Sequence, residues 1–229
     1  MKFLINLILI LINLSFAQDK SADKIIEKIK SNFDLINDYT VDINGKVDFP
    51  DAVIPELKAK VYFKKPNKMK IESDNFMIIP KQSIRFDPEI LYEKDFSSLV
   101  IGETKIDDVN HYIIKLISNN PEVEEVVTLW VNSKNFTIRK TNVIGSRIGK
   151  VEIEFFYKLI DNKYWLPEKL VATFEASKIR FPRMRRTEKE QKENSNSSKE
   201  GRITLQYSNY SVNKGIDDRI FEEKKKSIK

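Results

Sequence analysis

The 229-residue sequence contains no cysteine, a single histidine and only six glycines. Without cysteine there can be no disulfide, no thiol nucleophile and no cysteine-based zinc site, so an apolar core has to hold the fold together. His111 alone cannot build a histidine metal cluster, and a lone histidine in a predicted strand is more often structural or solvated than catalytic. The scarcity of glycine argues against glycine-rich phosphate loops. We therefore expect no metal and no cofactor.

No pair of carboxylates stands out as the acid and base of a hydrolase. Glu122, Glu124 and Glu125 occupy a turn and the start of a strand, where charge keeps a sheet edge soluble. The pairs Asp107-Asp108 and Asp217-Asp218 are typical of turns. The sequence thus predicts a protein that is not an enzyme and has no catalytic residue. Two acids converging in a polar cleft would instead favour a hydrolase.

No apolar run is long enough to span a bilayer, but the N-terminus carries a shorter one. Lys2 is followed by an apolar stretch over residues 3–14 and by the small-x-small sequence Ser15-Phe16-Ala17. This is the arrangement of a cleaved export signal, whereas a spanning helix needs roughly 20 apolar residues. We expect a signal peptide over residues 1–17, cleavage after Ala17 and one domain over residues 18–229. An uncleaved signal-anchor is the alternative.

Export and the absence of cysteine together predict a compartment. An exported protein without disulfides fits a Gram-negative periplasm better than a eukaryotic secretory route. Because no cysteine follows the signal, no lipid can be attached there. The mature protein is expected to be a soluble periplasmic protein.

The residues after the signal predict one helix and then a long strand. Over Ser21–Asn37 four apolar residues recur at helical spacing, and Ser21 is the expected N-cap. These apolar residues are Ile25, Ile29, Phe33 and Ile36. From Tyr39 to Phe49 the apolar period becomes two, which predicts a half-buried strand. Gly45 falls on the apolar face of this strand and suggests a bulge or bend there.

Further alternating runs predict a large antiparallel sheet. Residues 57–73 read as a hairpin whose turn is Lys65-Pro66-Asn67-Lys68, and Asp87-Pro88-Glu89 predicts a short helix over Pro88–Lys94. More strands are predicted over residues 98–103, 109–118, 125–132, 136–144, 149–158, 164–176 and 202–212. A long sheet with one apolar face is expected to curl over that face. The predicted fold is mainly β (α+β): one N-terminal helix and about ten antiparallel strands with one helical interruption, rolled into a barrel or half-barrel over the apolar face.

The formal net charge is +6, and the basic excess is local. Residues 177–201 form a polar insertion that opens with five cations, Lys178, Arg180, Arg183, Arg185 and Arg186. We expect a mobile basic loop that contacts a membrane surface or a membrane-protein partner, and the alternative is a solvated loop. Nucleic acid is not expected as a partner, because no aromatic stacking platform accompanies these charges.

Short motifs follow one another in a recognisable order. The exported helix precedes a long strand, and then comes the sequence Val61-Tyr62-Phe63-Lys64-Lys65-Pro66-Asn67. Central hairpin and closing-strand motifs occupy residues 112–117, 129–132, 138–140, 210–213 and 216–221. In these residues and their order the chain resembles the LolA-like family, which comprises periplasmic lipoprotein carriers and related lipid-binding and lipoprotein-sorting proteins. The resemblance covers nearly the whole mature chain.

The resemblance implies an incomplete antiparallel β-barrel (half-barrel) whose concave apolar face is covered by the N-terminal helix Ser21–Asn37 and the short inner helix Pro88–Lys94. Beneath these helices it implies a cavity for acyl chains. The expected function is periplasmic, non-enzymatic binding and transport of lipid or lipoprotein acyl chains by a monomer, in outer-membrane lipoprotein sorting or lipid trafficking. The alternative is a sensory or scaffold module of the same fold that binds a protein and fills the cavity with its own side chains. The predicted cavity lining is Val41, Ile43, Val61, Phe63, Met69, Ile71, Ile114, Leu129, Ile153 and Phe155.

Several positions depart from the family's carrier. The carrier has an arginine directly before the turn proline that hydrogen-bonds to the lid, and Lys65 stands there in this chain. Lysine lacks the planar fork of donors, so we expect a weaker or differently built latch. Met69 replaces an aromatic residue, residues 76–96 match poorly, and residues 177–201 have no counterpart. The predicted contacts to the lid or to headgroups are Lys65, Arg183, Arg185 and Arg186.

Overall fold

The computed structural model describes residues 21–50, 54–73, 96–122, 124–146, 149–178 and 200–222. Within these ranges the chain forms one α-helix, two 3-10 helices and ten strands. The helices are α2 (Ala22–Asp34), η2 (Ala176–Lys178) and η3 (Asp218–Phe221). The strands are β1 (Asp38–Asp48), β2 (Leu57–Lys64), β3 (Lys68–Glu72), β4 (Phe96–Ile106), β5 (Val109–Ser118), β6 (Glu125–Asn132), β7 (Ile138–Gly145), β8 (Gly149–Ile160), β9 (Tyr164–Glu175) and β10 (Glu200–Val212).

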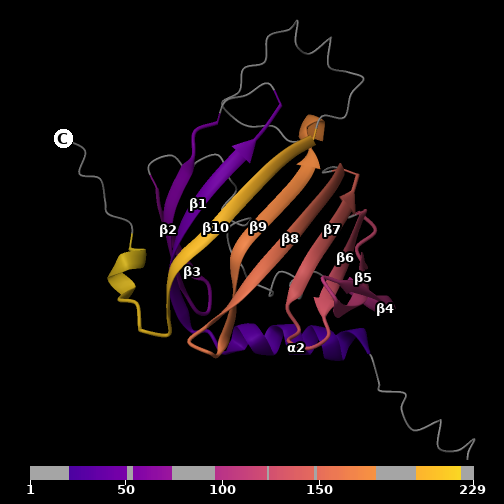
Figure 1. The fold of residues 1–229 in the computed structure, drawn as a ribbon, viewed down its shortest axis with the longest axis horizontal. Helices are drawn as coiled ribbons and strands as arrows, with labels where there is room; N and C mark the ends of the chain where they lie inside the picture. The colour runs from indigo at the N-terminus through magenta and orange to yellow at the C-terminus, as the bar shows by residue number, and fades with distance from the viewer. Residues whose placement is uncertain are drawn as a thin grey trace, which may run out of the picture.

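All ten strands belong to one antiparallel sheet in the order β3-β2-β1-β10-β9-β8-β7-β6-β5-β4 (Figure 1). Strands β4 to β10 follow one another as a meander, and β10 then lies beside β1. The sheet is not closed, because β3 and β4 remain its two edges. This is the predicted mainly β half-barrel with an N-terminal helix. The predicted signal peptide, the inner helix Pro88–Lys94 and most of the basic loop, including Arg183, Arg185 and Arg186, lie outside the described residues.

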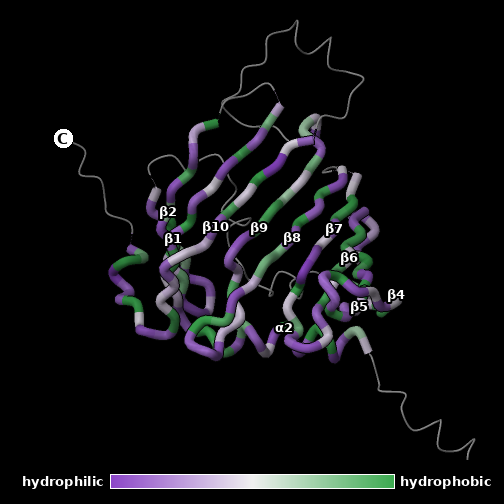
Figure 2. The backbone as a smooth tube through the Cα atoms, viewed as in Figure 1, coloured by the Kyte–Doolittle hydropathy of each residue, from purple (hydrophilic) through white to green (hydrophobic). Residues whose placement is uncertain are grey.

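Strict alternation gives the sheet one apolar face. A single row of directly paired residues crosses eight strands: Val100, Ile114, Leu129, Thr141, Ile153, Ala172, Ile203 and Val47. The residues one position along each strand point to the other face, which is largely polar. Figure 2 shows this alternation as green and purple segments along the strands. Such a sheet curls over its apolar side, because that side must be removed from water.

Gly45 lies on this apolar face without a bulge, which corrects the expectation from the sequence. It pairs directly with Leu57 and Leu205, and the bulge in β1 falls between Thr40 and Asp42 instead. A Cβ atom at Gly45 would lie 2.9 Å from Leu205 Cδ2 and 3.2 Å from Leu57 Cβ. Glycine is therefore needed here because the neighbouring leucines occupy the space of a side chain.

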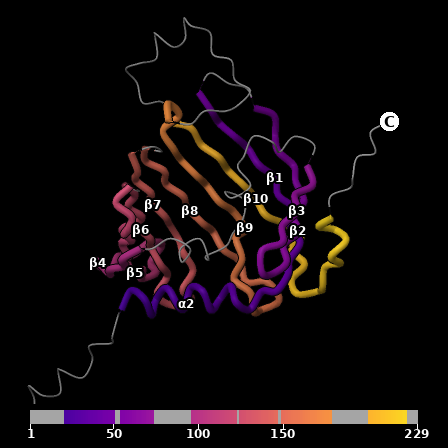
Figure 3. Tube along the Cα trace, turned by 180° about the vertical axis from the view of Figure 1, so that it is seen from behind, coloured from indigo at the N-terminus to yellow at the C-terminus, as the bar shows by residue number. Residues whose placement is uncertain are grey.

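Helix α2 crosses one end of the sheet, as Figures 1 and 3 show from opposite sides. Its buried residues are Ala22, Ile25, Ile26, Ile29 and Phe33. Ser21 occupies the N-cap position, but its side chain makes no capping hydrogen bond. The helix ends at Asp34 and not at the expected Asn37, because the chain then tightens into a turn in which Ile36 N donates to Phe33 O (2.9 Å). Among the described residues, no helix is long and apolar enough to cross a membrane.

Asn213 fastens the end of α2 to the end of β10. Its side-chain oxygen accepts from the backbone N–H of Asn37 (2.7 Å), and its amide nitrogen donates to Leu35 O (2.8 Å) and to Tyr164 Oη (3.0 Å). Its backbone N–H donates to Asp38 O (2.9 Å). Asn213 has φ 53°, a conformation that asparagine tolerates better than most residues. One side chain thus satisfies backbone groups that the turn between helix and strand leaves open.

We predict that Asn213→Ala lowers the free energy of unfolding by about 2 kcal/mol, because several partly buried hydrogen bonds lose their partner. Asn209→Ala is the matched control: Asn209 has φ 54° but bonds only Asp42 through its side chain (2.9 Å). Urea denaturation of both variants measures the difference. Equal losses of stability would contradict the role of Asn213 as a clamp.

Candidate functional site

The concave face of the sheet carries two apolar clusters. The first gathers buried residues of β1, β2, β9 and β10 around Phe63 and Leu205. The second joins the N-terminal half of α2 to β5, β6 and β7 around Ile114 and Leu129. Phe155 of β8 packs against both clusters. The apolar face is therefore continuous from β2 to β7, with Phe155 at the junction.

All ten predicted lining residues belong to these clusters. Six are at most 2% exposed: Val41, Ile43, Val61, Phe63, Ile114 and Leu129. The other four are partly buried and pack against the clusters: Met69, Ile71, Ile153 and Phe155. The structure thus gathers these residues on one face, whereas their contact with a ligand stays a prediction.

Sequence reasoning left several residues of this face out of the lining. Tyr207 pairs directly with Ile43, and Leu170 pairs with Phe155. Both are buried in the first cluster. The two-residue period of β9 and β10 was the available signal, because it places these side chains on the same face as their partners.

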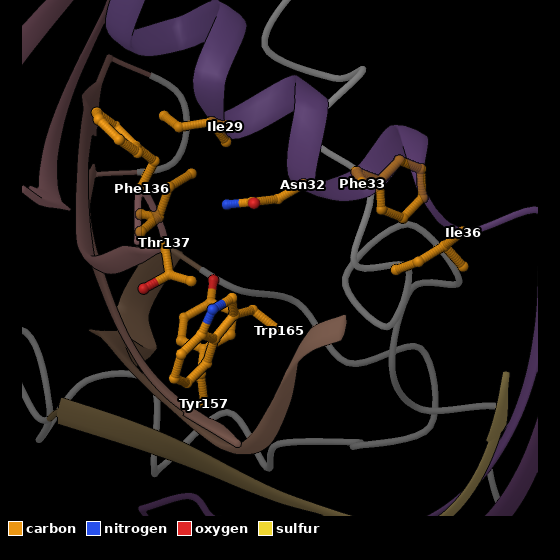
Figure 4. A pocket seen from close by; sticks show the side chains of 9 residues that line it. Ile29, Asn32, Phe33, Ile36, Phe136, Thr137, Tyr157 and Trp165 are labelled. Atoms are coloured by element: carbon orange, nitrogen blue, oxygen red, sulfur yellow. The ribbon is translucent and has the colours of Figure 1, made fainter. Parts of the chain in front are cut away.

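A narrow gap lies where α2 meets β7, β8 and β9 (Figure 4). Its volume is about 10 Å³, which is room for about one water molecule. Asn32 projects from α2 into the gap and donates from Nδ2 to Asn135 O (2.7 Å). The lining residues are Ile29, Asn32, Phe33, Ile36, Phe136, Thr137, Ile138, Tyr157 and Trp165. The contact between α2 and strands β7, β8 and β9, here called the seam, therefore admits nothing larger than water unless α2 shifts.

The hydroxyl groups of Tyr157 and Tyr207, which are buried near the clusters, are neutral. Burial raises the pKa of Tyr157 and of Tyr207, so both hydroxyl groups stay protonated at physiological pH. The nearby backbone of Ile138 opposes part of the rise in the pKa of Tyr157. An apolar face whose buried tyrosine hydroxyls carry no charge suits an uncharged, apolar ligand.

Three polar or charged residues are buried within the described ranges: Asp38, His111 and Thr137. Asp38 lies at the junction held by Asn213, where its Oδ1 accepts from Gly215 N (3.1 Å). His111 Nδ1 lies 2.8 Å from Val109 O on its own strand. Within the described ranges no three His, Asp or Glu residues group as metal ligands. Asp38 and His111 therefore contact polar groups of the fold itself.

Lys65 lies at the C-terminal end of α2. Its ammonium group donates to Asp34 O (3.2 Å) and to Asp34 Oδ1 (3.4 Å), and it lies 5.3 Å from the centre of the Phe33 ring. A cation at this end of a helix is stabilised by the exposed carbonyl groups. The turn between β2 and β3 is thereby attached to the covering helix.

Comparison with solved structures identifies this architecture. The chain aligns with a DUF1329 family protein from Desulfovibrio piger (TM-score 0.59, 11% identity, 88% of this chain and 97% of the other) and with a putative outer membrane lipoprotein-sorting protein domain from Vibrio parahaemolyticus (TM-score 0.59, 9% identity, 88% and 97%). It also aligns with a LolA superfamily protein from Nitrosomonas europaea (TM-score 0.54, 16% identity, 89% and 98%). The chain has a LolA-like fold. No protein-family profile matches the sequence, and no curated protein matches it significantly.

Within the LolA-like fold of this chain, polar contacts hold α2 near its start and in its last turn. Near its start, Ser98 Oγ of edge strand β4 donates to Asp23 Oδ1. Asn32 bonds the turn before β7, and Lys65 holds the last turn. The covering helix is thus attached to both halves of the sheet.

We predict that Lys65→Met increases hydrogen exchange in the last turn of α2 and lowers the free energy of unfolding by about 0.5–1 kcal/mol, because a half-exposed ion pair at the helix end is lost. Lys68→Met is the control, because the Lys68 ammonium group pairs with Asp218 (3.2 Å) and not with α2. Hydrogen exchange measured by mass spectrometry distinguishes the two variants. Unchanged protection of α2 in Lys65→Met would refute the attachment.

Proposed function

We propose that this protein is a non-enzymatic periplasmic carrier that binds lipid or lipoprotein acyl chains on the concave apolar face beneath α2. The continuous, uncharged apolar face from β2 to β7 is the observation that carries the proposal. The LolA-like fold supports it, because solved structures with this fold include a putative outer membrane lipoprotein-sorting domain. The N-terminal sequence, read as a cleaved export signal, supports the location.

Burial of methylene groups supplies the affinity in this proposal. Each CH₂ removed from water contributes about 0.8 kcal/mol, so one acyl chain can be held without a charged partner. The seam under α2 is closed in this structure, with a gap of about 10 Å³. A chain therefore enters only when α2 or side chains of the two clusters move. Arg183, Arg185 and Arg186 are the proposed headgroup or membrane contacts.

A second candidate is a module of the same fold that binds a protein partner and holds no lipid. The burial of six predicted lining residues to 2% exposure or less favours it, because the side chains already fill part of the face. Native mass spectrometry of protein isolated from its own periplasm separates the two candidates. Co-purifying lipid supports the carrier. Absence of lipid, together with no uptake of a fluorescent fatty acid, supports the protein-binding module.

Ala172→Phe tests the acyl-binding face directly. Ala172 lies on β9 between Ile153 and Ile203 in the apolar row, so a larger side chain occupies space above the concave face. We expect at least a fivefold loss of affinity for a fluorescent fatty acid, measured by fluorescence titration. Thr173→Phe is the matched control, because Thr173 points to the outer face between Glu152 and Arg202.

Thermal unfolding of both variants shows whether they remain folded. Equal affinities in two folded variants would contradict binding on the concave face.

A further inference from the structure

The outer face of the sheet carries a polar groove that the proposed acyl site does not use. Two adjoining hollows of about 500 and 510 Å³ share Asn44 and Ser208. One extends over β1, β2, β3 and β10, and the other extends over β1, β8, β9 and β10. We call the pair the outer groove. It is open to solvent, since Asn44 and Gln206 in its centre are exposed.

The strand register places a row of polar residues along this groove. Lys58 pairs with Asn44, Asn44 with Gln206, and Gln206 with Lys169. Neighbouring strands lie about 4.8 Å apart, so the two lysine backbones are separated by about 14 Å. Two amide side chains, which donate and accept hydrogen bonds, lie between two ammonium groups.

The lysines of the groove form no ion pair with a described carboxylate, although Asp42 and Glu72 stand opposite Lys60 in the strand register. Lys58, Lys60, Lys158 and Lys169 line it, and none has a described carboxylate within ion-pair distance. Three of them lie over aromatic rings instead: Lys60 at 6.0 Å from Tyr62, Lys158 at 5.8 Å from Tyr210 and Lys169 at 5.2 Å from Phe156. A ring positions an ammonium group without cancelling its charge.

Some other lysines of the same sheet are paired. Lys46 lies 3.0 Å from Asp48, and Lys140 lies 2.8 Å from Glu152. Lys115 has no ion pair among the described residues. The groove is therefore distinguished by its row, in which two lysines flank two amide side chains.

Three carboxylates also line the groove. Asp42 accepts a hydrogen bond from Asn209 (2.9 Å), and Glu72 accepts from Tyr62 (3.0 Å) and pairs with Lys70 (3.1 Å). Glu168 is exposed. The row from Lys58 to Lys169 contains no carboxylate, so an anion meets no like charge along it.

We propose that the outer groove binds the phosphate-bearing, hydroxylated headgroup of a lipid. Unpaired ammonium groups recognise phosphate as point charges, and the amides between them hydrogen-bond hydroxyl or ester oxygens. The groove is too open to enclose a free metabolite, which binding sites usually bury by more than two thirds. It suits a group presented at a membrane surface. The inference is independent of acyl binding on the concave face.

Glycerol 3-phosphate is the soluble probe, and side-chain amide signals give the readout. In ¹⁵N-labelled protein we expect the NH₂ signals of Asn44 and Gln206 to shift on titration, while equal concentrations of glycerol leave them unchanged. Lys58→Gln with Lys169→Gln should abolish the shifts. Shifts produced equally by sodium sulfate would indicate an adventitious ion only and would overturn the proposal.

Vesicle binding tests whether the headgroup is presented by a membrane lipid. Co-sedimentation with vesicles of phosphatidylglycerol and phosphatidylcholine should weaken at least about tenfold in the double variant, because each lysine near an anionic surface contributes about fivefold. The control removes the same charge from paired lysines, Lys46→Gln with Lys140→Gln, and should weaken binding less than about threefold. Glu168→Gln should strengthen it.

Equal weakening in both double variants would show that vesicle binding depends only on net charge, and it would overturn the proposed role of the outer groove. Absence of vesicle binding would contradict the proposal that the bound headgroup belongs to a lipid. Fluorescent fatty acid uptake in the same variants is expected to stay unchanged, so a failure here is distinguishable from a failure of the carrier proposal.

Discussion

A curved sheet with one apolar face is stable in water only while that face is covered, and the rest of this structure follows from that constraint. Side chains of eight strands stand in one row on the concave face. Five buried residues of α2 complete the cover at one end. A shift of one residue in any strand would turn its apolar set toward water, so the register is strongly fixed.

Burial alone does not orient the covering helix, because the hydrophobic effect has no direction. Hydrogen bonds fix the orientation of α2. Asn213 and Lys65 hold the C-terminal end of α2, and Asn32 holds its last third against the turn before β7. These groups come from three distant parts of the sequence. The position of the helix therefore depends on contacts from segments that lie far apart in the sequence.

The period of two was sufficient to predict the strands and the shared face of the ten lining residues, because alternation is a local property. The closed seam was not predictable in the same way. Tyr157 follows the same period of two as Phe155, but β9 carries one extra residue, Glu168, opposite the step from Phe156 to Tyr157. Trp165, which lines the gap beneath α2, lies beyond this bulge, and no sequence pattern marks the bulge. The outer groove also escaped prediction. It depends on the pairing of β1 with β10, whose residues Asn44 and Gln206 are far apart in the chain.

The sheet separates two kinds of chemistry by a single residue step. Ile43 is buried in the concave cluster, and Asn44, the next residue, lies in the outer groove. In the same way, Ala172 lies on the concave face and Thr173 lies on the outer face. Consecutive side chains on a strand have no common contacts across the sheet, so changes on one face reach the other only through the backbone. Apolar cargo and a charged surface can therefore be recognised by one thin layer without competing for the same residues.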